Sequence, residues 1–185
     1  MVLSLPALIG SYSTVGFSGS RSSVPSGCSD VAGLVRPGAV VAVGCARGVD
    51  AFFRSQFPWS SVFVAREFGR GRSSFARRSI AFVGFLQSSG GLLVSFPGGP
   101  CPVGLLPSAS SSACFSGLGS GSWATLALAL GLGVPSVVCC ESSWLPSAWA
   151  WGWGVSPVSE LAFPGFFACP AARGVAPAAS QLALF

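Results

Sequence analysis

A short apolar run that ends in a glycine-flanked turn constrains this chain more than any other feature. Residues 40–50 read Val-Val-Ala-Val-Gly-Cys-Ala-Arg-Gly-Val-Asp, so the apolar stretch stops at Gly44 and an Arg and an Asp follow. A buried strand that leads into a loop and then a helix has this pattern. We therefore expect an inner strand of a sheet, with its loop at the edge of that sheet.

Comparable apolar runs recur along the chain. They predict five strands, at residues 13–18, 39–43, 61–65, 92–96 and 134–139. Helical patterns predict helices at residues 24–35, 48–57, 73–87 and 122–132, the third of them capped by Ser73 or Ser74. Continuous apolar strands that alternate with helices are typical of a parallel sheet covered on both faces. The prediction is a doubly wound, Rossmann-like α/β fold with a mostly parallel five-stranded sheet in the order 3-2-1-4-5.

The chain suits one domain followed by an extension of different character. Its 185 residues are 51% apolar and 8% charged, which is not a disordered composition. We expect the Rossmann-like domain at residues 1–141 and an irregular, Trp- and Phe-rich tail at residues 142–185. Glycine and proline break this tail too often for a long helix, so we interpret it as cover that packs on the domain. A surface for a partner or for a homo-oligomer is the alternative, because Trp is enriched at such sites.

Residue types that usually carry metal or acid–base chemistry are scarce. The chain contains no His, and its seven Cys form no Cys-x-x-Cys pair. No zinc-binding spacing exists, so no metal site is expected. We interpret the Cys as small apolar residues in a reducing cytoplasm rather than as disulfide partners.

One stretch is apolar over nearly the length that spans a bilayer. Residues 123–140 carry no charge, but Gly131, Gly133 and Pro135 interrupt them. A buried helix followed by a buried strand explains the same residues, and we favour it. Residues 1–10 lack the basic start of a signal peptide. The expectation is a cytoplasmic protein without a membrane partner.

Four glycine-containing loops follow the expected strands or open the last helix, at residues 19–21, 44–50, 96–99 and 117–122. Glycine lets backbone amides approach a phosphate, a helix N-terminus attracts anions, and Arg offers a fork of donors that fits phosphate. In a doubly wound sheet such loops meet at the carboxyl ends of the strands, near the switch between strands one and four. They predict a site for a phosphate-bearing ligand, although turn formation explains each loop singly.

The order of these motifs resembles a known superfamily. Gly-Ser-Arg at 19–21, Gly-x-Ala-Arg-Gly-Val-Asp at 44–50, Arg-Ser-Ile at 78–80 and Gly-Ser-Gly-Ser-x-x-Thr at 119–125 are similar to motifs of the Rossmann-like SLOG superfamily, above all its DNA-processing protein A (Smf) family. Residues 96–108 are also similar to uncharacterised plasmid-borne cyanobacterial proteins, which implies no function. Loops and resemblance together imply a nucleotide- or nucleic-acid-phosphate pocket formed by Gly19, Ser20, Arg21, Gly44, Arg47, Gly48, Asp50, Arg78, Ser79, Gly119, Ser120, Gly121 and Ser122.

The leading hypothesis is capture of a nucleotide-derived or other phosphate-bearing ligand. Such a nucleotide is the cofactor that the sequence suggests, and the sequence indicates no other. Related phosphoribohydrolases carry Pro-Gly-Gly-x-Gly-Thr-x-x-Glu at this helix, whereas here Thr125 stands at the Glu position. Because glycosidic hydrolysis usually needs a carboxylate, an enzyme of that kind is a weaker alternative, with Asp50 and Glu67 as candidate catalytic residues. We interpret Asp50 first as a structural residue that caps its helix or pairs with Arg47.

A cluster of arginines supports another alternative, single-stranded DNA or RNA binding as in DNA processing. The candidate contacts to nucleic acid are Arg66, Arg70, Arg72 and Arg77. Arginines would contact the backbone while exposed aromatic rings stack on bases. A solvated face that keeps an apolar protein soluble explains the same charges. Smf proteins carry Lys at DNA-contacting positions, and this chain has no Lys.

Overall fold

A computed structural model describes residues 3–145, 156–159 and 165–168 of the chain. The strands in these residues form one eight-stranded sheet. They are β1 (Leu3–Ser4), β2 (Thr14–Gly19), β3 (Val40–Gly44), β4 (Ser61–Phe63), β5 (Leu92–Phe96), β6 (Ser136–Cys139), β7 (Ser156–Ser159) and β8 (Gly165–Ala168). Their order across the sheet is β1-β7-β8-β6-β5-β2-β3-β4.

The centre of the sheet has the predicted topology. Strands β4-β3-β2-β5-β6 pair in parallel, which confirms the order 3-2-1-4-5. Three further strands were not predicted: β8 pairs antiparallel with β6 and β7, and β1 pairs in parallel with β7. The tail thus adds two strands at this edge. Its residues 146–155, 160–164 and 169–185, including Trp149, Trp151 and Trp153, lie outside the described residues.

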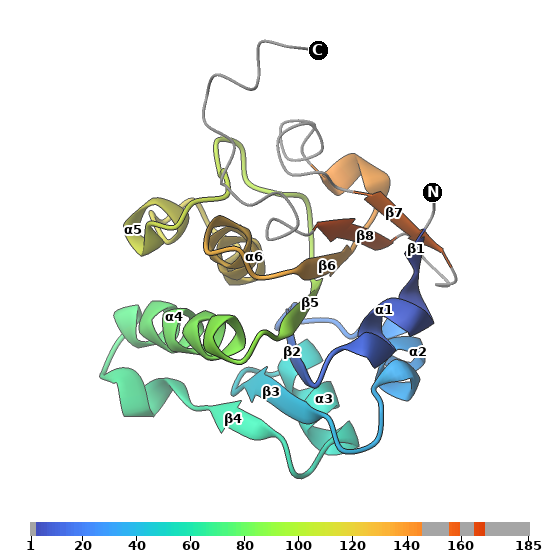
Figure 1. The fold of residues 1–185 in the computed structure, drawn as a ribbon. Helices are drawn as coiled ribbons and strands as arrows, with labels where there is room; N and C mark the ends of the chain where they lie inside the picture. The colour runs from blue at the N-terminus through green and yellow to red at the C-terminus, as the bar shows by residue number, and fades with distance from the viewer. Residues whose placement is uncertain (1–2, 146–155, 160–164, 169–185) are drawn as a thin grey trace.

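Helices cover both faces of the sheet. They are α1 (Leu5–Ser11), α2 (Gly27–Leu34), α3 (Val49–Gln56), α4 (Ser73–Ser88), α5 (Ser111–Cys114) and α6 (Gly121–Gly131), with short 3-10 turns η1 (Ala65–Phe68) and η2 (Ser142–Trp144). Figure 1 shows α1, α2 and α3 on one side of the sheet and α4 and α6 on the other. This is the doubly wound α/β arrangement that the sequence predicts.

Alternate residues of the inner strands fill two separate cores. In β3, Val41 and Val43 pack on the side of α1, α2 and α3, whereas Ala42 packs with α4 and α6, because successive side chains of a strand point to opposite faces. Gly16 of β2 lies under α4, where an added Cβ would stand 2.6 Å from the Leu86 side chain. A larger residue at this position would push α4 away from the sheet.

Helix α6 is buried along its length, with every side chain from Trp123 to Leu130 at most 3% exposed. A helix that is apolar all round needs cover on every side, and the sheet, α4 and α5 supply it. The strand β6 follows, so residues 123–140 form the predicted buried helix and strand. Within the described part of the chain, no helix combines the length and apolar character needed to cross a membrane.

Some local predictions were wrong. Neither serine caps α4: the helix begins at Ser73 after an N-cap at Arg72, and the Ser74 hydroxyl donates to the Gly71 carbonyl at 2.7 Å. The helix predicted at residues 24–35 is α2, which begins at Gly27 instead of residue 24. The strand predicted at residues 61–65 is β4. It ends at Phe63, because the chain then turns into η1, which packs against α4.

Candidate functional site

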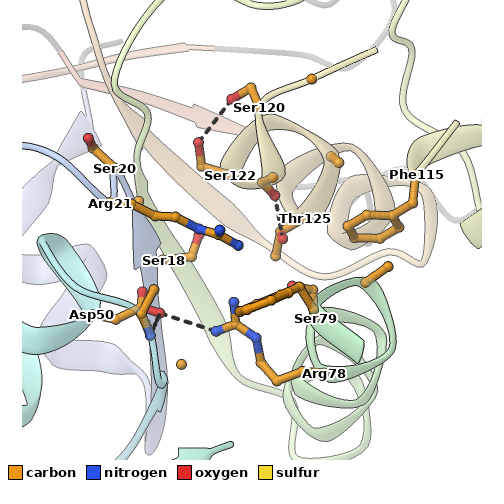
Figure 2. Close-up of a pocket in the computed structure, with 18 of the residues that line it drawn as sticks. Ser18, Ser20, Arg21, Asp50, Arg78, Ser79, Phe115, Ser120, Ser122 and Thr125 are labelled. Atoms are coloured by element: carbon orange, nitrogen blue, oxygen red, sulfur yellow. Dashed lines mark hydrogen bonds and ion pairs between the residues drawn. The ribbon is translucent and has the colours of Figure 1, made fainter. Parts of the chain in front are cut away.

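A cavity of about 910 Å³ opens at the carboxyl ends of the central strands. Residues that follow β2, β3 and β5 line it together with the start of α6 (Figure 2). The neighbouring strands β2 and β5 lead to helices on opposite faces, so the cavity lies at the switch point of the sheet. The predicted residues that meet here are Gly19, Ser20, Arg21, Gly44, Asp50, Arg78, Ser79, Gly119, Ser120, Gly121 and Ser122.

An ion pair forms part of the cavity wall (Figure 2). Arg78 Nη1 lies 3.1 Å from Asp50 Oδ2, and the side chains are 11% and 3% exposed, respectively. The same carboxylate oxygen accepts the amide N–H of Ala46 at 3.1 Å. Asp50 is therefore paired with Arg78 instead of Arg47, and it fixes the loop after β3.

A second arginine, which the sequence did not single out, holds the same loop. Arg54 Nη1 donates to the carbonyl oxygens of Gly44 at 2.6 Å and Ala46 at 3.0 Å. Arg54 stands four residues after Asp50 on α3, so both side chains lie on one face of that helix. The loop is thus held at an amide and at two carbonyl groups without any ligand.

Two glycines of this loop are required by close contacts. A Cβ at Gly44 would overlap the Arg78 guanidinium. Gly48 has φ +66°, which favours glycine, and a Cβ there would overlap the Ser20 carbonyl. The Val49 amide donates to that carbonyl at 2.9 Å. The loop after β3 therefore packs directly on the loop after β2.

Ser20 organises the loop after β2. Its Oγ accepts the amides of Ser22 and Ser23, both at 3.2 Å, and the Ser23 hydroxyl at 3.0 Å. Its own amide donates to the Phe96 carbonyl at 2.8 Å. Gly98 passes so close that an added Cβ would lie 2.6 Å from Ser20 Oγ. The Ser20 hydroxyl already has hydrogen-bond partners within the protein, so the role of Ser20 is to hold the loop that forms this wall of the cavity.

The N-terminus of α6 faces the cavity without a side-chain cap. Ser120 at the N-cap has φ 38°, and among the described residues no other non-glycine residue has a positive φ. Its hydroxyl lies 3.2 Å from that of Ser122. The first turn contains no acidic residue. The amides and dipole of such a helix end favour a bound anion.

The cavity also presents positive charge and an unused hydroxyl. Among the described residues, Arg21, Arg72 and Arg78 line it, against the single carboxylate of Asp50. The Ser79 side chain is 7% exposed, lines the cavity, and makes no hydrogen bond to the described residues. Arg78 Nε is buried and likewise lacks a partner among them. Buried polar groups normally have partners, and a polar ligand would supply one to Ser79.

Several predicted residues lie away from the cavity. Arg47 and Glu67 are exposed and do not line it, and Glu67 forms no ion pair with a described residue. Gly48 contributes through packing alone. Thr125 does line the cavity, and its hydroxyl donates to the Gly121 carbonyl at 2.7 Å.

The arginine cluster is divided between the cavity and the surface. All four side chains are exposed, and only Arg72 among them lines the cavity. Those outside are Arg66, Arg70 and Arg77. Arg77 Nη1 lies 3.4 Å from the Phe68 carbonyl, so it braces η1 against α4.

Aromatic side chains that the sequence did not single out also line the cavity, namely Phe75, Phe82 and Phe115. Phe75 is 37% exposed, and the guanidinium carbon of Arg21 lies 4.6 Å from the centre of its ring. Phe115 follows α5 in the long segment between β5 and α6. The length of that segment was the only sequence signal for a contribution of this kind.

Among the described residues, the thiol that lines the cavity has a raised pKa and stays protonated at neutral pH. Cys114 lines the cavity, burial raises the pKa of its thiol, and the thiol donates a hydrogen bond to the Ser108 carbonyl. The six cysteines of the described segments are free. These segments also contain no group of three side chains suited to hold a metal ion.

Comparison with protein-family models, with curated proteins and with solved structures finds no match to this chain. The interpretation of the cavity therefore depends on its own geometry. Glycine-rich loops, arginines and a helix N-terminus provide its polar part, and phenylalanines, among them Phe75, Phe82 and Phe115, provide an apolar part.

Proposed function

We propose that the protein binds a phosphate-bearing ligand, foremost a nucleotide-derived one, at the carboxyl edge of its parallel sheet. The observation that carries this proposal is the convergence of four glycine-containing loops, three arginines and an uncapped helix N-terminus on one cavity. Backbone amides at a helix N-terminus are a general phosphate-binding device, and ligands of doubly wound sheets bind at the switch point.

The phosphate group lies between α4 and the start of α6 in this proposal. Figure 2 shows Arg21, Arg78 and Ser79 around the same space as Ser122 and Thr125. Arg21 and Ser79 then donate to the phosphate together with amides of α6. Arg78 adds charge while Asp50 holds it in place.

A nucleotide is the favoured source of the phosphate because the loop motifs resemble those of the Smf family. Binding is favoured over hydrolysis because Thr125 stands at the position of the phosphoribohydrolase Glu. Asp50, the carboxylate that lines the cavity, is 3% exposed and engaged with Arg78.

Thermal unfolding with nucleoside mono- and diphosphates and with inorganic phosphate at millimolar concentration tests the proposal. A ligand at 100 times its Kd raises the free energy of unfolding by about 2.7 kcal/mol. Arg21→Gln and Ser79→Ala should each reduce the ligand-induced rise in melting temperature. Arg36→Gln removes the same charge at an exposed site away from the cavity and should preserve the rise. A melting temperature unchanged by every ligand would reject the proposal.

Single-stranded nucleic acid binding is the second candidate, and the exposure of four arginines favours it. Arg72 connects the cavity with the surface that carries Arg66, Arg70 and Arg77. A gel shift at about 50 mM salt should detect a complex that weakens steeply as salt rises. Absence of a shift at that salt concentration would remove this candidate.

A further inference from the structure

Side chains from α4, α5 and α6 add an apolar surface to the cavity, and phosphate binding alone does not use it. This surface is formed by Phe75, Phe82, Cys114, Phe115 and Ala124. Ligand pockets commonly combine such a surface, which binds the body of the ligand, with a few polar groups that orient it. The ligand should therefore have an apolar part beside its phosphate.

Phe115 is the best-placed ring of this surface. Its back is packed against the core on the α4 and α6 side, and the ring is partly exposed to the cavity. Figure 2 shows it beside α6, on the far side of the cavity from Arg21 and Asp50. Phe115 stacks with no other aromatic ring of the described residues. A flat ring of the ligand can therefore take that position.

Phe75 connects the apolar surface to the phosphate-binding groups. The Arg21 guanidinium carbon lies 4.6 Å from the centre of the Phe75 ring, a geometry in which the ring attracts the cation. Phe75 is 37% exposed. An anion bound to Arg21 therefore lies next to apolar surface, and the body of the ligand extends over that surface.

We infer that the ligand is a phosphate monoester that carries a flat aromatic ring, with its phosphate at Arg21, Ser79 and the α6 N-terminus and its ring on Phe115. This inference rests on the proposed function and narrows it. Rossmann-fold sites for dinucleotides present an acidic side chain to a ribose hydroxyl. Here the lining carboxylate, Asp50, is 3% exposed and paired with Arg78. Stacking, instead of sugar recognition, then selects the ligand.

Isothermal titration calorimetry with three phosphate monoesters tests the inference. Phenyl phosphate should bind about tenfold more tightly than glycerol phosphate, since an aromatic pair adds stacking to burial of apolar area. Ribose 5-phosphate should bind within about twofold of glycerol phosphate, because both present hydroxyls to the apolar surface. Equal Kd values for the three esters would overturn the inference and leave the proposed function standing. Failure of all three to bind would overturn the inference, and the proposed function would fall with it only if no nucleotide raised the melting temperature.

Substitution of the stacking ring provides the second measurement. Phe115→Leu keeps an apolar side chain in the core and should lower the preference for phenyl phosphate to about twofold, with an unchanged Kd for glycerol phosphate. Phe52→Leu, on α3 at the opposite face of the sheet, is the matched control and should retain the full preference. A preference that survives Phe115→Leu in a folded protein would overturn the role of this ring.

Discussion

The loops after β2 and β3 form the strand side of the cavity, and residues 117–122 form its helix side. The glycines of these two sides have different structural roles. On the strand side, a Cβ at Gly44 or Gly48 would overlap neighbouring atoms, so these glycines allow loops to pack. On the helix side, Gly117, Gly119 and Gly121 have nothing within 4 Å of an added Cβ. Similar-looking glycine-rich motifs therefore serve packing on one side and open backbone on the other.

The polar groups differ in the same way. On the strand side, Asp50, Arg54 and the Ser20 hydroxyl bind groups of the protein itself. On the helix side, the start of α6 has no side-chain cap, and Ser122 is partly exposed. Apart from Arg21, the strand side fixes the shape of the cavity, and the helix side leaves donors for a ligand.

The largest expected effect comes from filling a packing glycine. Gly44→Ala should lower the free energy of unfolding by about 3 kcal/mol, because the methyl group displaces the Arg78–Asp50 pair. Gly121→Ala, its matched control at an open glycine, should change the free energy by less than about 0.5 kcal/mol. Urea denaturation measures both. Equal effects would remove the distinction between the two sets of glycines.

Breaking the Asp50–Arg78 ion pair should lower the free energy of unfolding by less than Gly44→Ala does. Asp50→Asn should lower the free energy of unfolding by about 2 kcal/mol, below the usual loss for a fully buried pair because Arg78 is 11% exposed. Adding Arg78→Gln should recover part of the loss, since no unpaired charge then remains. A double-mutant cycle by urea denaturation measures the coupling. Coupling near zero would show that the pair does not organise this side.

The buried thiols of the two cores predict that the free energy of unfolding depends on pH. Burial raises the pKa of Cys28 to about 12 from an ordinary value of 9.0, and burial, with Cys101 and Glu141 nearby, raises that of Cys140 to about 12. These thiols ionise first in the unfolded chain. Their stabilisation is complete below pH 9 and decreases by about 1 kcal/mol per thiol per pH unit as pH rises toward 12.

Urea denaturation between pH 7 and pH 10.5, a range that brackets the ordinary thiol pKa, measures this slope. Cys28→Ala should reduce the slope of the free energy of unfolding against pH by the contribution of one thiol. A profile that stays flat over the whole range would contradict the buried state of these groups.

The smallest effect is expected at the start of α6. Ser120→Gly should raise the free energy of unfolding by about 0.5 kcal/mol, because glycine accepts the positive φ of 38° without the strain of a Cβ. Thermal unfolding measures the gain. A loss of stability would mean that the Ser120 hydroxyl, 3.2 Å from that of Ser122, holds this turn together.

The five central strands could be predicted because burial on both faces gives them continuous apolar runs, as in β3 and β5. Strand β1 has two residues, and β7 and β8 have four each in segments with glycine and proline. Runs this short carry no periodic signal, so these strands were missed.

The loops of the site could be predicted from glycine and arginine, but the partners of individual side chains could not. Arg54 looks like an ordinary residue of an amphipathic helix, yet it holds the loop after β3. Arg47, inside the most distinctive motif, is exposed and does not line the cavity. Phe115 reaches the cavity because α5 folds back over α6. Such roles depend on contacts between segments far apart in sequence.

The pairing of β1 with β7 has a consequence for the order of assembly. Leu3 lies opposite Val158, so this pair closes a loop that runs from residue 3 to residue 158, and such closure is slow. The five central strands need only residues 14–139. During synthesis on the ribosome, they can therefore pair before β7 exists. We expect the nascent protein to pass through a stage with an open β6 edge, because exposed strand edges promote aggregation and chaperone binding.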